Sequence, residues 1–232
     1  MLISEIFYSL QGEGELAGVP SVFIRTSGCN LRCRWCDTPY ASWDPGGGEM
    51  GVERILEEVK KWPARHVVLT GGEPMIARDI HGLAAGLRDA GYHITIETAG
   101  TVAPGGIACD LASISPKFSN STPLEGSIDP AWIKRHEGSR HRPDILAQWI
   151  GESPSYQIKL VLGSEEDASE ALGILKPELP DVPPWKIHLM PEGKDPETLG
   201  SREGWLIDFC KKFGYRYCSR LQIHLFGNTR GT

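Results

Sequence analysis

Three cysteines, Cys29, Cys33 and Cys36, lie within eight consecutive residues. Thiolates at this spacing can converge on one soft metal centre, such as an iron–sulfur cluster. Three protein ligands leave one iron of a cubane cluster open, and by analogy with zinc an open position is typical of a catalytic site. The alternative is a zinc site of three cysteines and one histidine, but the nearest histidine in the sequence is His66 and no closely spaced histidines accompany the cysteines. The spacing therefore favours an iron–sulfur site.

A Gly-Gly-Glu-Pro turn at Gly71–Pro74 forms the second motif, directly after the β-rich run His66–Thr70. The two glycines permit a tight turn and a close approach of the backbone to a ligand, and Pro74 removes a donor and fixes the exit of the chain. Taken alone, the motif is also an ordinary strand-to-helix turn. Its position one strand–helix–strand unit after the cysteines favours a ligand-binding turn.

The segments that position these motifs alternate between β-rich and helical patterns. Strands are expected at residues 1–8, 21–26, 66–69, 93–97, 109–115, 157–162, 186–190 and 216–225, and helices at 52–59, 80–87, 164–175 and 201–213. This alternation is typical of βαβ units and a mainly parallel sheet. Both motifs directly follow strands, where such folds place their chemistry.

The length and composition favour one α/β domain covering residues 1–232, because 232 residues with 40% hydrophobic content can bury one core. About six parallel strands and an N-terminal hairpin strand are expected, whereas a closed eight-unit barrel typically needs ~250 residues. We therefore predict an incomplete (β/α) barrel. Residues 118–154 are rich in Ser, Pro, Gly and charge, with one weak helical pattern at 132–136, and are interpreted as a surface excursion with no assigned role.

The charge and the termini exclude several classes of partner. The formal net charge is −6 and there is no long block of Lys or Arg, so direct nucleic-acid binding is not expected. The N-terminus lacks a signal-peptide pattern, and no apolar run has the length of a membrane span, so no membrane association is expected. A cytoplasmic location is predicted, with Cys109, Cys210 and Cys218 as buried small hydrophobic residues.

The cysteine motif, with Trp35 before its last cysteine, and the Gly71–Pro74 turn together resemble the radical S-adenosylmethionine (SAM) superfamily. The N-terminal sequence narrows this resemblance to the 7-carboxy-7-deazaguanine synthase family. The matching segments are Glu5–Gly14, Val22–Arg25, Cys36–Thr38, Thr70–Pro74, Glu97–Gly100, Ser115–Lys117, Met190–Gly193 and Gly227–Gly231. They run the whole length of the chain. Two departures are Ala99, where Asn is common, and a 118–154 segment longer than in the shortest relatives.

The resemblance implies a carbon–nitrogen lyase that converts 6-carboxy-5,6,7,8-tetrahydropterin to 7-carboxy-7-deazaguanine with loss of ammonia, in 7-deazapurine (queuosine-type) biosynthesis. In that family the cluster reduces SAM by one electron, and the resulting 5′-deoxyadenosyl radical removes hydrogen from C6 of the pterin before the ring contracts. SAM is regenerated. The cofactors carry the chemistry, so no amino-acid side chain is predicted to be catalytic.

The resemblance also implies a [4Fe-4S] cluster, SAM and Mg²⁺ as cofactors, an electron donor such as flavodoxin as a partner, and a homodimer. The cluster ligands are Cys29, Cys33 and Cys36, and the Mg²⁺ ligand is Thr38. The substrate-binding residues are Leu10, Gln11, Gly12, Glu13, Arg25, Thr70 and Thr232. The SAM-binding residues are Trp35, Asp37, Gly72, Glu73, Ser115, Pro116, Lys117, Met190, Pro191, Glu192 and Gly193.

Several of these assignments have simpler alternatives. Without the resemblance, Gln11 and Glu13 are residues of a glycine-rich turn, Arg25 is a surface residue of a strand, and Lys117 is a solvated lysine. For Thr232, a frayed chain end is the alternative to a terminal carboxylate that accepts from the N–H groups of the pterin; the tail is expected to follow a strand directly.

Two other functions are also considered for the whole chain. One is a radical SAM activase that forms a glycyl radical on a partner enzyme, although the Gln-Gly-Glu-Gly opening at Gln11–Gly14 is not expected in an activase. The other is an electron-transfer or structural metal module, which predicts four protein ligands and no SAM binding.

Overall fold

A nine-stranded sheet, mostly parallel, organises the computed structural model, which describes residues 1–232. The strands are β1 (Leu2–Leu10), β2 (Pro20–Thr26), β3 (Gly48–Glu49), β4 (His66–Gly71), β5 (His93–Thr98), β6 (Leu111–Ile114), β7 (Tyr156–Leu162), β8 (Ile187–Pro191) and β9 (Arg216–Tyr217), in the order β3-β1-β2-β4-β5-β6-β7-β8-β9. Strands β2 and β4 to β9 pair in parallel, whereas β1 is antiparallel to β2 and β3. The sheet does not close into a barrel, because its two edge strands, β3 and β9, do not pair with each other. The predicted incomplete barrel with an N-terminal hairpin strand is confirmed.

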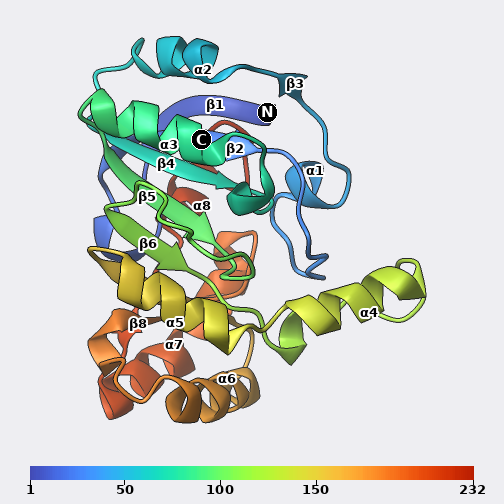
Figure 1. Ribbon diagram of the computed structural model, residues 1–232. Coiled ribbons are helices and arrows are strands. Elements are labelled where there is room, and N and C mark those ends of the chain that lie inside the picture. Colours follow the sequence, from blue (N-terminus) through green and yellow to red (C-terminus); the bar gives the residue numbers. More distant parts are fainter.

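Eight α-helices accompany the sheet, and most of them cover its outer face (Figure 1). They are α1 (Pro39–Ser42), α2 (Val52–Val59), α3 (Ile80–Asp89), α4 (Pro130–Ser139), α5 (Pro143–Glu152), α6 (Glu165–Glu178), α7 (Pro196–Phe213) and α8 (Leu221–Phe226). Helix α3 packs on β5, α5 on β6, α6 on β7 and α7 on β8. None of the helices combines the length and the apolar character required to cross a membrane.

Helix α7 begins earlier than the predicted residue 201 because Asp195 caps it. The Asp195 carboxylate accepts from the Thr198 N–H at 2.8 Å, which satisfies one of the free N–H groups of the first turn. The helix ends where Gly214 takes a left-handed conformation with φ 76°, which a residue without a Cβ adopts at little cost.

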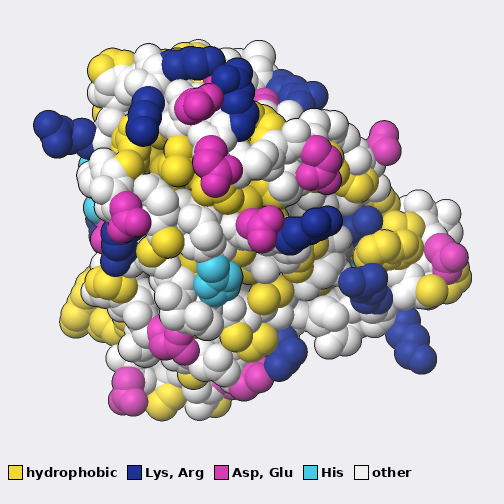
Figure 2. Space-filling model, turned by 45° about the horizontal axis from the view of Figure 1, so that its top comes forward, with side chains coloured by type: hydrophobic (Ala, Val, Ile, Leu, Met, Phe, Trp, Pro, Cys, Tyr) yellow, Lys and Arg dark blue, Asp and Glu magenta, His cyan; other side chains and the backbone are white.

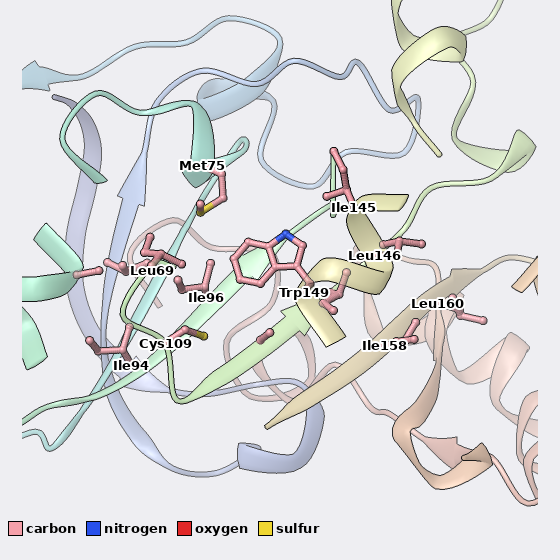
Figure 3. Packing of buried hydrophobic residues seen from close by; sticks show 14 of the residues in the cluster. Leu69, Met75, Ile94, Ile96, Cys109, Ile145, Leu146, Trp149, Ile158 and Leu160 are labelled. Carbon is pink, nitrogen blue, oxygen red and sulfur yellow. The ribbon is translucent and has the colours of Figure 1, made fainter. Parts of the chain in front are cut away.

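The core contradicts the prediction that residues 118–154 form a surface excursion throughout. Ile145, Leu146 and Trp149 of α5 recur at helical spacing and are buried, with Trp149 0% exposed. Figure 3 shows Trp149 lying among Met75, Ile96 and the other apolar residues of the central cluster. Its indole N–H donates to the Val102 carbonyl at 2.9 Å, so the buried ring leaves no donor unpaired. Only the part around α4 stands away from the body of the molecule (Figures 1 and 2).

The predicted strand at 216–225 is wrong beyond its first two residues. Strand β9 ends at Tyr217, and the chain turns into α8. The alternation of Leu221, Ile223 and Leu225 suggests a strand, but only Ile223 is buried, whereas Leu225 is 51% exposed. The Leu221 N–H donates to the Gly12 carbonyl at 3.0 Å, which joins α8 to the loop after β1. The C-terminal tail therefore follows a helix rather than a strand.

Buried His188 of β8 gives a testable dependence of stability on pH. It is the register partner of Lys159, and its Nε2 has no hydrogen-bond partner. Burial, and then the charges of Arg216, Lys159 and Lys186, lower the pKa of His188 to about 3. The unfolded chain therefore takes up this proton near pH 6.5 and the folded chain does not, so stability is lost as the pH falls from about 6.5 towards 3.

We expect His188 to account for about 2 kcal/mol of lost unfolding free energy at pH 5. The variant His188→Leu should lose about that much less than the wild type between pH 7.5 and pH 5. Urea unfolding at both pH values measures the difference. Equal losses in the two proteins would contradict the assignment.

Candidate active site

The cysteine motif lies on a loop, residues 27–38, between β2 and α1. The Gly28 N–H donates to the Ala41 carbonyl at 2.8 Å, and the Glu73 N–H donates to the Gly28 carbonyl at 3.0 Å. A Cβ on Gly72 would lie 2.3 Å from the Gly28 carbonyl oxygen and 2.7 Å from the Cβ of Cys29. Glycine at position 72 therefore lets the turn after β4 pack directly on the cysteine loop.

All three cysteines of the loop line one large cavity. Burial raises the pKa of Cys29 and of Cys33 to about 12, so both are protonated at neutral pH until a metal displaces the proton. No group of three or more His, Cys, Asp or Glu side chains is arranged to hold a single metal ion. In a cubane cluster each cysteine binds a different iron, so three thiols spaced around a cavity fit a cluster better than a lone zinc ion.

Glu73 holds the loops around this cavity together and does not line it. One carboxylate oxygen accepts from the Thr98 hydroxyl at 2.8 Å and the other from the Ala99 N–H at 2.8 Å. Burial raises the pKa of Glu73, while the hydrogen bonds from Ala99, Thr98 and Met75 oppose the rise. The group that Ala99 contributes is its backbone N–H, which an Asn at this position would supply equally.

The residues predicted to bind SAM divide into two groups. Those on the cavity wall are Trp35, Asp37, Gly72, Ser115, Lys117, Met190 and Glu192, whereas Glu73, Pro116, Pro191 and Gly193 lie outside it. The Lys117 ammonium lies 5.4 Å from the centre of the Trp35 ring and donates to the Ser115 carbonyl at 2.6 Å. Burial lowers the pKa of Lys117. The solvated-lysine alternative is wrong, because this side chain faces the cavity beside the cysteine loop.

The residues predicted to bind substrate all line the same cavity: Leu10, Gln11, Gly12, Glu13, Arg25, Thr70 and Thr232, as does the predicted Mg²⁺ ligand Thr38. The Arg25 guanidinium donates to Glu5 at 2.7 Å, and Tyr40 donates to the same carboxylate at 2.9 Å. Arg25 is therefore not a free surface residue of a strand. Its Nε atom is bonded to Glu5, and its guanidinium carbon lies 5.7 Å from the centre of the Phe7 ring.

A buried network of charged residues that the sequence analysis missed connects these positions. Lys159 of β7, 5% exposed, lies 2.9 Å from Glu13 and 3.5 Å from Glu97. Glu97 of β5 also accepts from Gln11 at 3.2 Å and from Thr70 at 3.0 Å. A lysine within the apolar run of residues 156–162 is the signal that could have identified this network in the sequence.

Arg220, which follows β9, joins positions predicted to bind the substrate to positions predicted to bind SAM. Its Nε lies 3.2 Å from Glu13, its Nη2 donates to Asp37, and its Nη1 donates to the Gly193 carbonyl. Gln222 donates to Glu13 at 2.8 Å. Burial alone would raise the pKa of Glu13, but the charges of Lys159 and Arg220 outweigh burial and hold that pKa well below its usual range. The Glu13 carboxylate is therefore ionised and faces the cavity as an acceptor.

The C-terminal tail closes one side of the cavity. Gly227, Asn228, Thr229, Gly231 and Thr232 contribute to the cavity wall. The Arg230 guanidinium donates to Glu5 at 3.3 Å and to the Ser4 carbonyl at 2.7 Å, and it lies 4.6 Å from the centre of the Tyr40 ring. The tail is therefore attached to β1 and not frayed.

Comparisons with known proteins find similar sequences and a similar fold along the chain. The family profile described as Radical SAM superfamily matches residues 23–114. Over 232 residues the chain is 48% identical to a 7-carboxy-7-deazaguanine synthase of Rhodopirellula baltica, covering 100% of this chain and 89% of that protein. A 7-carboxy-7-deazaguanine synthase of Halobacterium salinarum is 40% identical, with 99% and 92% covered. The crystal structure of QueE from Escherichia coli superposes with a TM-score of 0.68 at 28% identity, covering 95% of this chain and 93% of that chain.

Proposed function

Because the chain belongs to the 7-carboxy-7-deazaguanine synthase family of radical SAM enzymes, we propose that its cavity converts 6-carboxy-5,6,7,8-tetrahydropterin to 7-carboxy-7-deazaguanine with loss of ammonia. The observation that carries the proposal is one cavity that brings the three cysteines together with Gln11 and Glu13. The reaction class is that of a carbon–nitrogen lyase. The alternative of a glycyl-radical activase is not favoured, because the similarity to the synthases covers the whole chain.

The cysteines Cys29, Cys33 and Cys36 hold the [4Fe-4S] cluster in this proposal, which with SAM supplies the radical chemistry when bound. Trp35, Asp37, Gly72, Ser115, Lys117, Met190 and Glu192 contact SAM from the cavity wall, and Pro116, Pro191 and Gly193 extend the same strand ends. Lys117 offers a cation for the SAM carboxylate. Glu73 positions the backbone of the turn through its bonds to Thr98 and Ala99.

The pterin is a donor-rich anion, and the cavity presents complementary groups for it. Leu10 and Gly12 shape the loop, and Gln11, Glu13 and Thr70 supply hydrogen-bonding atoms to the ring. Arg25 provides a guanidinium for the substrate carboxylate, because Glu5 engages its Nε and leaves the other N–H groups available. Thr38 is the proposed Mg²⁺ ligand, since Mg²⁺ takes most of its other ligands from substrate and water.

Further proposals concern the state of the protein. We propose that it acts as one domain, because the main core cluster extends from Met1 to Tyr215. We propose a homodimer, an electron donor such as flavodoxin, and a cytoplasmic location, where a reducing environment would keep the six free cysteines reduced.

A direct test separates the proposed synthase from an activase. The anaerobically reconstituted protein is incubated with SAM, a chemical reductant and either the carboxy-tetrahydropterin or a glycyl-radical enzyme. We expect a new ultraviolet spectrum and the mass of 7-carboxy-7-deazaguanine in the first reaction, and no radical signal in the second. A glycyl radical without pterin turnover would reverse the assignment.

The terminal carboxylate of Thr232 is expected to accept hydrogen bonds from the N–H groups of the pterin ring, because the tail is attached to β1 and lines the cavity. Two glycines appended after Thr232 would move this charge away without deleting a side chain. We expect KM for the pterin to rise about 10-fold, which corresponds to about 1.4 kcal/mol, with SAM binding unchanged.

Thr232→Ala is the matched control for this extension. It keeps the carboxylate and removes a methyl group and the hydroxyl that donates to the Thr229 carbonyl at 2.8 Å, so KM should stay near the wild-type value. Wild-type kinetics in the extended protein would show that the terminal carboxylate is not a ligand.

A further inference from the structure

The segment 118–139, which contains α4, bonds to the cysteine loop through Ser121 and His136, and to β7 and α6 through Ser119 and Asn120. Figure 1 shows α4 projecting from the body of the molecule, and Figure 2 shows the same arm in space-filling form. The cysteine loop itself has no helix or strand between residues 27 and 38. Its conformation therefore depends on bonds to other segments, of which 118–139 is one.

Two of these bonds lie on either side of Cys33. The Arg32 N–H donates to His136 Nδ1 at 3.1 Å, and the Arg34 N–H donates to the Ser121 carbonyl at 3.0 Å. His136 and Ser121 are both 0% exposed. Since both neighbours of Cys33 are bonded to the same buried segment, the direction in which Cys33 leaves the backbone is fixed from both sides.

The acceptor on α4 is itself held in place. Because His136 Nδ1 accepts from a backbone N–H, the ring proton of the neutral imidazole is on Nε2. His136 Nε2 lies 3.0 Å from the Ser121 hydroxyl, which donates to the Phe118 carbonyl at 2.7 Å. The hydrogen bonds therefore run from the Arg32 N–H through His136 and Ser121 to the Phe118 carbonyl, and an apolar ring at position 136 would leave the Arg32 N–H without this acceptor.

The same arm also holds the Cys29 end of the loop. The Arg32 guanidinium stacks on Trp132 of α4 at 3.9 Å from the ring centre and donates to the Cys29 and Leu31 carbonyls at 2.8 Å each. Arg135 lies 4.8 Å from the same ring. Trp132 therefore lies between two guanidinium groups, one from the cysteine loop and one from α4.

We propose that residues 118–139 form a clamp that positions the cysteine loop for cluster binding, with His136 as its main positioning residue. The inference rests on the proposed cluster site. Ordering a loop costs backbone conformational entropy, and a clamp that orders the loop beforehand removes this cost from the binding of the cluster.

The test compares His136→Phe, which keeps an aromatic ring but removes the acceptor, with His136→Asn, whose amide oxygen can accept in place of Nδ1. His141→Phe is the matched control, because it keeps an aromatic ring against Phe118 and removes a bond to Glu178, and His141 has no hydrogen bond to the cysteine loop. Hydrogen exchange of the Arg32 and Arg34 amides is measured in the metal-free protein, and iron release to a chelator is measured in the reconstituted protein.

In His136→Phe we expect the Arg32 and Arg34 amides to exchange, and iron to be released, at least about 10-fold faster than in the wild type, in line with other residues that orient metal ligands. His136→Asn should recover most of the difference, His141→Phe should match the wild type, and KM for the pterin should change little. Wild-type exchange and iron release in a folded His136→Phe protein would overturn the proposal.

Trp132→Ala provides a second route if His136→Phe does not fold, because it removes the ring that Arg32 and Arg135 contact and leaves the hydrogen bonds of His136 in place. Faster exchange of the Arg32 amide and faster iron release in that variant support the clamp, and wild-type values overturn it. If the wild type itself takes up no cluster, the proposed function fails, and the exchange data in the metal-free protein still decide whether the clamp exists.

Discussion

Replacing Cys33 by alanine is expected to remove the iron–sulfur cluster and to lower pterin turnover by at least about 1,000-fold, or about 4 kcal/mol of transition-state stabilisation. Cys29, Cys33 and Cys36 are the only thiols on the cavity wall, so no other side chain can take over the lost ligand. Iron and sulfide content after anaerobic reconstitution, and turnover in the same samples, measure the effect.

Cys109→Ala is the control for this prediction. Cys109 is buried in the core beside Ile94 and Ile96 (Figure 3), away from the cavity wall. The substitution should cost about 1 kcal/mol of stability through the small void it leaves, and it should keep the iron content and the rate. A Cys33→Ala protein with full iron content, or a Cys109→Ala protein without iron, would disprove the ligand assignment.

The second large effect is expected for Arg220→Met. Arg220 is 7% exposed and bridges Glu13 and Asp37, one predicted to contact the pterin and the other SAM. Methionine fills much of the same volume without a charge, so Asp37 loses its ion pair with Arg220 and Glu13 keeps only Lys159 and Gln222. Removing one partner of a buried ion pair typically costs about 3–5 kcal/mol of stability. Because Arg220 would no longer hold Glu13 and Asp37 in place on the cavity wall, we expect kcat/KM to fall at least about 100-fold.

Arg216→Met is the matched control, because it is the same substitution four positions earlier in the chain. Arg216 is 47% exposed at its side chain and lies 3.5 Å from Glu15, outside the cavity wall. An exposed pair of this kind contributes about 0–1 kcal/mol, so activity should change little. Calorimetric titration of each variant with SAM and with the pterin separates a binding defect from misfolding. Equal kcat/KM in the two variants would show that the Arg220 bridge has no role in the reaction.

The sequence alone predicts the parts of this site that are local. The cysteine motif and the Gly-Gly-Glu-Pro turn can be recognised in the sequence, because each is defined by a few neighbouring residues and each follows a strand. Glu73 shows where a local motif is not sufficient. The resemblance predicts that Glu73 contacts SAM, whereas in the structure its carboxylate is bonded to Thr98 and Ala99. The motif indicates the right turn and not which of its atoms face the cavity.

The buried charged network cannot be predicted from local sequence, because it depends on which strands are neighbours and on their register in the barrel. Lys159 and Glu97 lie on separate strands, and their distance follows from which strands are neighbours of β6. His136 contacts Arg32 across 104 positions of sequence, and nothing in the local pattern of α4 indicates that contact. The predicted strand at 216–225 failed for a related reason: the alternation of apolar residues there does not correspond to burial.

The most direct test of the proposed activity is a multiple-turnover reaction with the carboxy-tetrahydropterin in excess over SAM. The reaction uses the anaerobically reconstituted wild type, with the Cys33→Ala protein in parallel, and mass spectrometry quantifies 7-carboxy-7-deazaguanine while an enzymatic assay quantifies ammonia. We predict one ammonia for each product molecule, product in excess of the SAM supplied, and none from Cys33→Ala. Recovery of unchanged pterin from a wild-type protein that contains its cluster and binds SAM would contradict the proposed function.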